Sequence, residues 1–238
     1  MPLLDLILPA YKPCIGWHKY ALRRLHELQE ARPEWEMRLI VVSDGSPYGH
    51  EPEVLSTFAE GMQGRFTHIH YPDNRGKGYA LRQAVAASSA DYILYTDWDF
   101  PFTTESYLSA LDSLKDGAAV VLPVRKALEY RRHLSLQRRF FSLGSHLINC
   151  LLLGLPSKDT QGGIKAFDRR GRAVFLQTSI DRFLFDTEFI VLATRAQMDL
   201  RQTSCHVRPE IVMSSMSWKA LCQELRYIPR LFLKRWFY

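Results

Sequence analysis

Two aspartates one residue apart end a short apolar run, and their carboxylates are the first candidates for chemistry in this chain. The stretch from Tyr92 to Phe100 reads Y-I-L-Y-T-D-W-D-F. The length of the run and its β-branched and aromatic content predict a buried strand. Asp97 and Asp99 should then lie at its carboxyl end, where α/β proteins bind ligands. Residues i and i+2 of an extended chain point to the same side, so both carboxylates are predicted to address one cation or ligand. An acidic turn in solvent is the commoner explanation of an isolated D-x-D pattern.

Other polar segments also follow predicted strands. They are Pro9–Lys12, Ser43–Ser46 and Asp73–Gly78. A parallel sheet brings such loops together along one rim, where a nucleotide would bind. Asp44 is a candidate acceptor for a base edge, and Lys77 adds a positive charge for a diphosphate. Gly76 and Gly78 are expected to let a ligand approach a helix N-terminus, which favours anions. On its own, however, G-K-G is more often a plain turn.

The elements that must position these residues are predicted from the alternation of apolar and helical patterns. In the first half we expect strands at 3–8, 37–42, 66–71, 92–96 and 118–123, and helices at 17–31, 54–60, 76–88 and 103–115. This order predicts an α/β fold with a doubly wound, mostly parallel sheet flanked by helices. In the second half we expect a long basic helix around 133–153, a helix at 187–198 and a strand at 200–208.

Length and composition describe one globular domain of 238 residues, with 47% hydrophobic and 24% charged residues. We divide it into a nucleotide-binding half (1–125), an acceptor half (126–217) and a basic C-terminal segment (218–238). The apolar run at 147–155 falls far short of the roughly 20 residues that span a bilayer. No signal peptide is expected, and four cysteines without a C-x-x-C pair argue against zinc and for a cytoplasmic protein.

The formal net charge of +6 is concentrated in two clusters. One contains Arg131, Arg132, Arg138 and Arg139, and the other contains Lys219, Arg226, Arg230, Lys234 and Arg235. Such clusters suit nucleic acid, anionic lipid or phosphorylated ligands, although a solvated basic face is the plainer explanation. The C-terminal cluster is interleaved with apolar residues, so it is predicted to lie in a membrane interface. A helix that packs on the domain is the alternative, and Pro229 is expected to interrupt it.

In chain order, the segments L-P-A-Y, V-S-D-G-S, N-R-G-K-G-Y-A-L, T-D-W-D and D-T-Q-G-G-I-K-A-F resemble family 2 inverting glycosyltransferases of the GT-A fold. Within these, the chain looks most like the dolichyl- or polyprenyl-phosphate mannose or glucose synthases. The resemblance runs from about residue 6 to residue 188. Its most specific part is D-T-Q-G-G-I-K-A-F, since those synthases carry D-T-Q-C-G-F-K-x-F at that place.

The resemblance implies a role for each matched residue. The residues implied at the nucleotide sugar are Pro9, Ala10, Tyr11, Asp44, Lys77 and Asp97. Asp99 would hold Mg²⁺ or Mn²⁺ against the diphosphate. Asp159 and Gln161 would lie beside the sugar and the acceptor, which makes Asp97, Asp99, Asp159 and Gln161 the implied catalytic set. The residues implied at the acceptor phosphate are Arg125, Arg138 and Ser142.

The chain departs from the family pattern at several of these positions. Lys12 and Pro13 follow Tyr11 where the family continues with Asn and Glu, and Pro101 stands where the synthases often have a Gln. A bulky Trp98 replaces the usual small residue inside the D-x-D motif. Segment 213–217 lacks the acidic residue or His often seen there. These departures leave open an altered donor, or a protein that binds without turnover.

The predicted function is transfer of a sugar, with inversion and metal assistance, from a nucleotide-diphosphate sugar to a polyprenyl or dolichyl phosphate. The alternatives are a glycan acceptor, or a nucleotide- or anion-binding protein without catalysis. A nucleic-acid-binding module ranks last, because it would leave D-W-D and D-T-Q unexplained. The expected location is the cytoplasmic face of a membrane, with peripheral contact.

Overall fold

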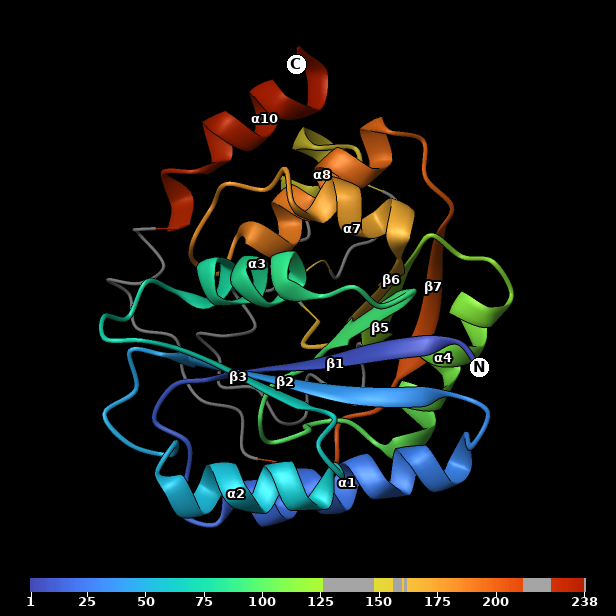
Figure 1. The fold of residues 1–238 in the computed structure, drawn as a ribbon. Coiled ribbons are helices and arrows are strands. Elements are labelled where there is room, and N and C mark those ends of the chain that lie inside the picture. The colour runs from blue at the N-terminus through green and yellow to red at the C-terminus, as the bar shows by residue number, and fades with distance from the viewer. Residues whose placement is uncertain (126–147, 156–159, 161, 212–223, 238) are drawn as a thin grey trace.

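The computed structural model describes residues 1–125, 148–155, 160, 162–211 and 224–237. Their strands form one seven-stranded sheet in the order β3-β2-β1-β4-β6-β5-β7 (Figure 1). The strands are β1 (Leu3–Ala10), β2 (Glu36–Asp44), β3 (Phe66–Tyr71), β4 (Tyr92–Tyr95), β5 (Val120–Arg125), β6 (Lys165–Asp168) and β7 (Leu200–Cys205).

The sheet is mostly parallel, as the sequence predicts. Strands β1 to β4 run in one direction, and β5 pairs in parallel with β7. Strand β6 is antiparallel to both of its neighbours, β4 and β5. Ala10 pairs with Ser43, so the carboxyl ends of β1 and β2 lie together, and Tyr95 at the end of β4 pairs with Lys165 at the start of β6. One rim therefore gathers the carboxyl ends of the parallel strands and the segment that precedes β6.

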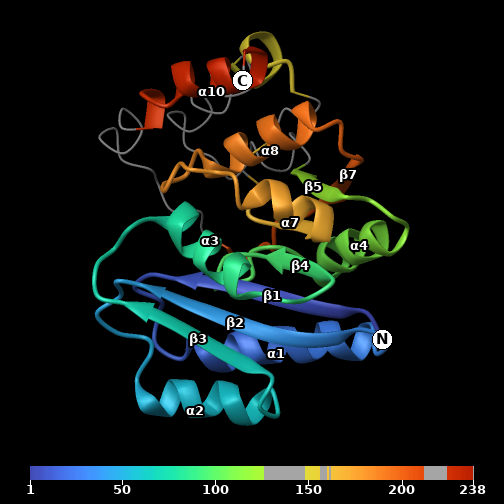
Figure 2. The ribbon, with the colours of Figure 1, turned by 45° about the horizontal axis from the view of Figure 1, so that its top comes forward.

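Helices cover both faces of the sheet (Figures 1 and 2). The helices on one face are α1 (Trp17–Ala31), α2 (Pro52–Gly61) and α4 (Thr104–Lys115). Those on the other are α3 (Lys77–Ala87), α7 (Arg169–Phe175), α8 (Phe185–Arg195) and α10 (Ile228–Trp236). A π-helical turn spans Ile148–Leu152. Strand β1 is buried on both sides, with Leu6 and Leu8 toward α1 and Ile7 toward α3, which explains its unbroken apolar sequence.

Several sequence predictions need correction. The strand expected at 200–208 ends at Cys205, and the helix expected at 187–198 begins at Phe185. Most of the basic helix expected around 133–153 lies outside the described residues. Strand β6 and helix α7 were not predicted. Strand β6 has only four residues and begins with the buried Lys165, so its sequence shows no hydrophobic periodicity. The interruption expected at Pro229 is present: residues 224–225 are helical, 226–227 form a turn, and α10 begins anew at Ile228. Pro229 lies in the first turn of α10, where its missing N–H costs no hydrogen bond.

The S-D-G-S turn after β2 packs directly on the loop after β3. Gly45 has a φ of +61°, and a Cβ atom built on it would lie 2.1 Å from the backbone nitrogen of Asn74. Glycine is required here both by the left-handed backbone and by the close approach of the two loops. The two segments that follow neighbouring strands are thus held together at the rim.

We expect Gly45→Ala to lower the free energy of unfolding by about 3 kcal/mol or more, because backbone strain and steric overlap add. Gly64→Ala is the matched control, since Gly64 has a φ of +81° with nothing within 4 Å of the added atom. It should lose only about 1–2 kcal/mol. Urea unfolding of the two variants measures both values, and equal losses would show that the contact with Asn74 does not matter.

Candidate active site

The described residues that the sequence assigns to the nucleotide sugar all come from the carboxyl-end rim. Pro9 and Ala10 are buried at the end of β1, and Tyr11 beyond them is 44% exposed. Asp44 ends β2, and Lys77 begins α3. The backbone of Arg125 ends β5 beside β7. The other predicted residues, Asp159, Gln161, Arg138 and Ser142, lie outside the described residues, so their roles stay predictions.

Lys77 and Asp97 form the central ion pair of this rim. The Nζ atom of Lys77 donates to Oδ1 of Asp97 at 2.6 Å. Burial by itself would lower the pKa of Lys77, but the charges of Asp97, Asp186 and Asp99 outweigh it and raise that pKa. Lys77 is therefore held as a cation at neutral pH. A fixed ammonium at this position suits an anionic ligand.

The D-W-D motif is a turn, which corrects the expected extended geometry. Strand β4 ends at Tyr95, and the amide of Phe100 donates to the carbonyl of Asp97 at 3.0 Å. Trp98 points toward α1, where its ring lies 6.3 Å from that of Trp17 in an edge-on contact. The bulky residue inside the motif thus packs against the core. The two aspartates still face a common environment, because each changes the electrostatics of Lys77.

Asp99 is the carboxylate of this turn whose buried charge is not balanced by hydrogen bonds. Burial and the charge of Asp97 raise its pKa from 3.8 to about 6, and one of its carboxylate oxygens, Oδ1, is buried without a hydrogen-bond partner. A divalent cation fits this atom, because it would supply the missing opposite charge, and hard carboxylate oxygens suit Mg²⁺ or Mn²⁺. The described residues contain no group of three or more His, Cys, Asp or Glu that could hold a metal ion. Phosphate oxygens and water would then complete the coordination, as is usual for Mg²⁺.

Arg208 holds the D-W-D turn from the other side, and no motif in the sequence singles it out. Its guanidinium donates to the carbonyl oxygens of Asp99 at 2.9 Å and Phe100 at 2.8 Å. Its own amide donates to the carbonyl of Pro101 at 3.0 Å, and its side chain lies over the ring of Tyr20. Arg208 follows β7, more than a hundred residues along the chain. A contact of that sequence separation leaves no local pattern, so only the fold reveals it.

Asp44 connects the end of β2 to the loop that carries Lys77. Its carboxylate accepts from the amide of Arg75 at 2.8 Å, from the amide of Gly76 at 3.0 Å and from Nδ2 of Asn74 at 3.0 Å. These bonds fix the backbone immediately before α3. The contact of Asp44 with a base stays a prediction. The role that the structure gives Asp44 is to place the residue next to Lys77.

The glycines around Lys77 serve a different purpose from the one expected. A Cβ atom on Gly76 would lie 2.5 Å from the carbonyl oxygen of Asp181, and one on Gly78 would lie 2.4 Å from that of Ile180. The amides of Gly78 and Tyr79 both donate to the Asp181 carbonyl, at 2.7 and 3.1 Å. The carbonyl of Asp181 therefore lies at the start of α3, where the sequence predicted a bound anion. Gly76 and Gly78 admit another loop of the chain.

The described part of D-T-Q-G-G-I-K reaches the same rim through a buried network. Lys165 is fully buried, donates to the carbonyl of Gly162 at 2.7 Å and lies 3.5 Å from Asp186, which also accepts from the hydroxyl of Tyr95. Burial raises the pKa of Asp186, although Lys165 and Lys77 oppose the rise. A Cβ atom on Gly163 would lie 2.8 Å from Oδ2 of Asp97. The glycine pair of this motif therefore rests against the D-x-D turn.

Thr160 in the same motif is anchored by two polar side chains. Its hydroxyl accepts from Nδ2 of Asn149 at 3.1 Å and lies 2.9 Å from the hydroxyl of Thr187 on α8. All three residues are buried. Asn149 belongs to the π-helical turn, and its contact with Thr160 ties that turn to the D-T-Q motif. The structure thus joins two segments that the sequence had assigned to the acceptor.

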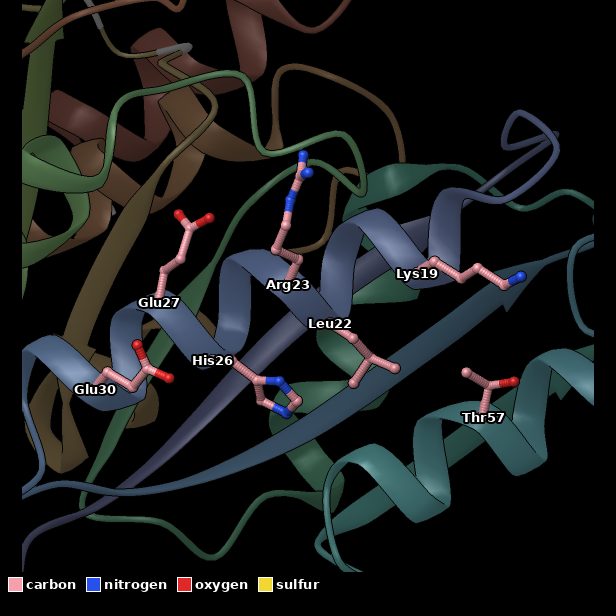
Figure 3. A pocket seen from close by; sticks show the side chains of 7 residues that line it. All are labelled: Lys19, Leu22, Arg23, His26, Glu27, Glu30 and Thr57. Carbon is pink, nitrogen blue, oxygen red and sulfur yellow. The ribbon is translucent and has the colours of Figure 1, made fainter.

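A hollow between two helices is separate from this site. It lies between α1 and α2 and is lined by Lys19, Leu22, Arg23, His26, Glu27, Glu30 and Thr57 (Figure 3). His26 bonds the carbonyl of Gly61 at 3.0 Å, which joins the two helices. The lining charges have both signs, as is usual on solvated helix surfaces, and none of the predicted site residues contributes to the hollow. We assign no function to it.

We expect Asp99→Asn to stabilise the metal-free protein at pH 7. With a pKa of about 6, the folded state binds more protons than the unfolded state between roughly pH 4 and 6, so stability falls as pH rises through that range. Removing the charge should restore about 1–2 kcal/mol, after allowance for the partial exposure of Asp99. The advantage should disappear below about pH 4.

Thermal unfolding from pH 4 to 8 measures this effect, with Asp73→Asn at an exposed position of the same rim as the control. Addition of millimolar Mn²⁺ and a nucleoside diphosphate should raise the melting temperature of the wild type and leave that of Asp99→Asn unchanged. A loss of stability in Asp99→Asn at pH 7 would contradict the assignment of Asp99 as an uncompensated carboxylate.

Comparison with solved structures supports the fold. A glucosyl-3-phosphoglycerate synthase from Mycobacterium tuberculosis, crystallised with Mn²⁺, UDP-glucose and phosphoglyceric acid, superimposes with a TM-score of 0.61 at 15% identity. The match covers 98% of this chain and 79% of that one. Another crystal structure of the enzyme gives a TM-score of 0.59 at 18% identity. At these identities the likeness shows the fold, a mixed and mostly parallel GT-A sheet flanked by helices.

Curated proteins that are similar in sequence align with most of this chain. A dolichyl-phosphate beta-glucosyltransferase of Trichomonas vaginalis is 29% identical over 196 residues, which are 77% of this chain and 55% of that protein. The enzyme of the same name from Dictyostelium discoideum is 25% identical over 84% of this chain and 65% of its own length. The one from Mus musculus is 27% identical over 94% of this chain and 74% of its own length. The chain thus spans between about half and three quarters of these relatives.

A family model described as glycosyl transferase family 2 matches residues 5–175, from β1 through α7. The match includes the S-D-G-S turn, the G-K-G loop, the D-W-D turn and the D-T-Q-G-G segment. It covers well over half of the chain. This protein belongs to glycosyl transferase family 2.

Proposed function

We propose that this protein transfers a sugar, with inversion, from a nucleotide-diphosphate sugar to a dolichyl or polyprenyl phosphate. The observation that carries the proposal is the rim geometry: Lys77 paired with Asp97, beside Asp99 with its buried, unpartnered oxygen. This arrangement suits a diphosphate and a divalent cation together. The names of the similar curated proteins support the acceptor class, and they make glucose the first sugar to test.

The donor side of the mechanism follows from three side chains. Lys77 is held as a cation and would bind the diphosphate, while Asp97 would orient the ribose or the sugar. Asp99 would hold Mg²⁺ or Mn²⁺, since even with its pKa raised to about 6 this carboxyl is mostly ionised at neutral pH. A bound cation neutralises charge on a departing nucleoside diphosphate. Arg208 fixes the turn through backbone carbonyls, so the carboxylates need not reorganise during the reaction.

The acceptor side needs little proton transfer. A phosphate monoester is already largely ionised at neutral pH, so its oxygen can attack the anomeric carbon without a strong general base. We propose Asp159 and Gln161 beside the sugar, and Arg125, Arg138 and Ser142 at the phosphate. Thr160, held by Asn149, supports the placement of the D-T-Q motif at the rim. Arginine suits this task because its fork of donors matches phosphate oxygens.

We also propose that α10 makes peripheral contact with an anionic membrane at its cytoplasmic face. Leu233, Trp236 and Phe237 are 45%, 51% and 71% exposed, and Arg226 and Arg230 lie on the same segment. Exposed aromatic and basic side chains together suit the interface of a bilayer with acidic lipids. In Figures 1 and 2, α10 lies at the outer edge of the α8 layer, where a flat surface can reach it. Among the described residues, no helix is long and apolar enough to cross a membrane.

The activity test uses the purified chain with UDP-glucose, Mn²⁺ and a short-chain dolichyl phosphate, and measures labelled sugar in the lipid fraction. Asp97→Asn and Lys77→Met should each reduce transfer by about 10²-fold or more, since each removes a charge aimed at the donor. Lys115→Met is the control, because that exposed side chain pairs with Glu34 away from the rim. Label transferred to a glycan instead would overturn the acceptor assignment, and binding without release of UDP would overturn catalysis.

The membrane contact predicts sedimentation with vesicles that contain phosphatidylserine. We expect binding to increase with the fraction of acidic lipid and to weaken as salt screens the basic residues. The double variant Trp236→Ser and Phe237→Ser should release the protein, whereas Ile15→Ser, at a fully exposed apolar position in the loop before α1, should not. Equal binding of all three proteins would exclude α10 as the contact.

A further inference from the structure

Glu188 is a buried carboxylate that joins three parts of the chain. Its side chain on α8 is fully buried. One oxygen accepts from the amides of Ser179 at 2.7 Å and Ile180 at 2.8 Å, and the other accepts from the hydroxyl of Ser179 at 2.8 Å and from Nζ of Lys234 at 2.5 Å. Burial opposes ionisation, but Lys234 and the Ser179 donors outweigh it and lower the pKa of Glu188. The ionised carboxylate therefore holds the loop at 179–182 against α8 and α10.

The same loop determines where α3 begins. The carbonyl of Asp181 accepts the amides of Gly78 and Tyr79, and the guanidinium of Arg82 donates to the carbonyl of Ile180 at 2.8 Å. Arg82 also forms an ion pair with the carboxylate of Asp181. Because the loop fills the space beside Gly78, any shift of the loop displaces the first turn of α3. The start of this helix is thus set by tertiary contacts.

Lys77 is the first residue of α3, and its backbone is held from both sides. Asp44 binds the amide of Gly76 before it, and Asp181 binds the amide of Gly78 after it. From this fixed backbone the side chain of Lys77 extends to Asp97. Since a displacement of a charged group by as little as 1 Å can cost a large part of its catalytic effect, this support matters for function.

Helix α10 supplies the last contact of this series. Besides its bond to Glu188, Lys234 donates to the hydroxyl of Ser179 at 3.1 Å, and Arg230 donates to the same hydroxyl at 2.7 Å. Ser179 is therefore held by two cations of α10 and one carboxylate of α8. The neighbouring Arg235 instead donates to the carbonyl of Leu153 at 2.9 Å, away from this loop.

We propose that Glu188 is a positioning residue for Lys77, and that α10 sets its effect through Lys234, so that docking of α10 and binding of the donor diphosphate are coupled. The inference rests on the proposed function for the role of Lys77. The path from Lys234 through Glu188 and the 179–182 loop rests on the described contacts alone. Because such coupling is reciprocal, a partner that changes the docking of α10 also changes donor affinity.

The first experiment tests the path without any ligand. Hydrogen exchange of the peptide that contains Gly78 and Tyr79 should be faster in Lys234→Met and in Glu188→Gln than in the wild type. Arg235→Met is the matched control, since it removes one positive charge from the adjacent position of α10 and leaves the Ser179 contacts intact. Unchanged exchange at Gly78 and Tyr79 in both test variants would overturn the path.

The second experiment tests the consequence for the donor, with UDP and Mn²⁺ as the probe in calorimetric titrations without lipid. Lys234→Met should weaken binding about five- to tenfold, whereas Arg235→Met should not. In a Lys77→Met background, Lys234→Met should add nothing further, because its effect passes through Lys77. A general loss of folding would instead weaken binding in both backgrounds.

The outcomes separate this inference from the proposed function. If Lys77→Met itself leaves UDP affinity unchanged, the role of Lys77 in the proposed function fails. If Lys77→Met weakens binding while Lys234→Met has no effect, or if the two effects simply add, the positioning role of Glu188 and α10 is overturned. Faster exchange at Gly78 and non-additive loss of UDP affinity together support it.

Discussion

The burial of two carboxylates beside a third is the constraint on which the rim depends. Burial raises the pKa of both Asp99 and Asp186, and the charge of Asp97 adds to the effect at each of them. Lys77 and Lys165 supply compensating charge. The charge of Arg208 also opposes the rise at Asp99, but one oxygen of that carboxylate stays buried without a hydrogen-bond partner. Such an oxygen suits a cation that accompanies a bound anion.

The sequence predicts the parts of this arrangement that have a local cause. Strand β4 is apolar and ends in charges, so the place of Asp97 and Asp99 at the sheet rim follows from the pattern. Lys77 follows in the same way from the order of strand, loop and helix. The turn geometry of D-W-D did not follow, because it depends on Trp98 packing against Trp17 in another element. The resemblance to the family made each of these motifs more informative, because the family pattern contains all of them in the same order.

The remainder of the site was unpredictable because it depends on long-range contacts. Nothing in the residues around Arg208 indicates that it binds the carbonyls of the D-W-D turn. Gly76 and Gly78 do permit a close approach, as predicted, but the group that approaches is the loop at 180–181 and not a ligand. A glycine in a sequence indicates a close approach without identifying the partner. The binding of the Arg75 and Gly76 amides by Asp44 is a further role that the sequence did not indicate.

The antiparallel insertion of β6 has an evolutionary consequence. Because β5 ends and β6 begins at the same rim, the whole segment 126–164 leaves the sheet and returns to it between adjacent strands. The entropic cost of closing such a connection grows only with the logarithm of its length. A change in its length is therefore cheap as long as Gly163, which rests against Asp97, keeps its place. The sheet therefore fixes the two ends of this connection, while the length of the connection is left free to vary.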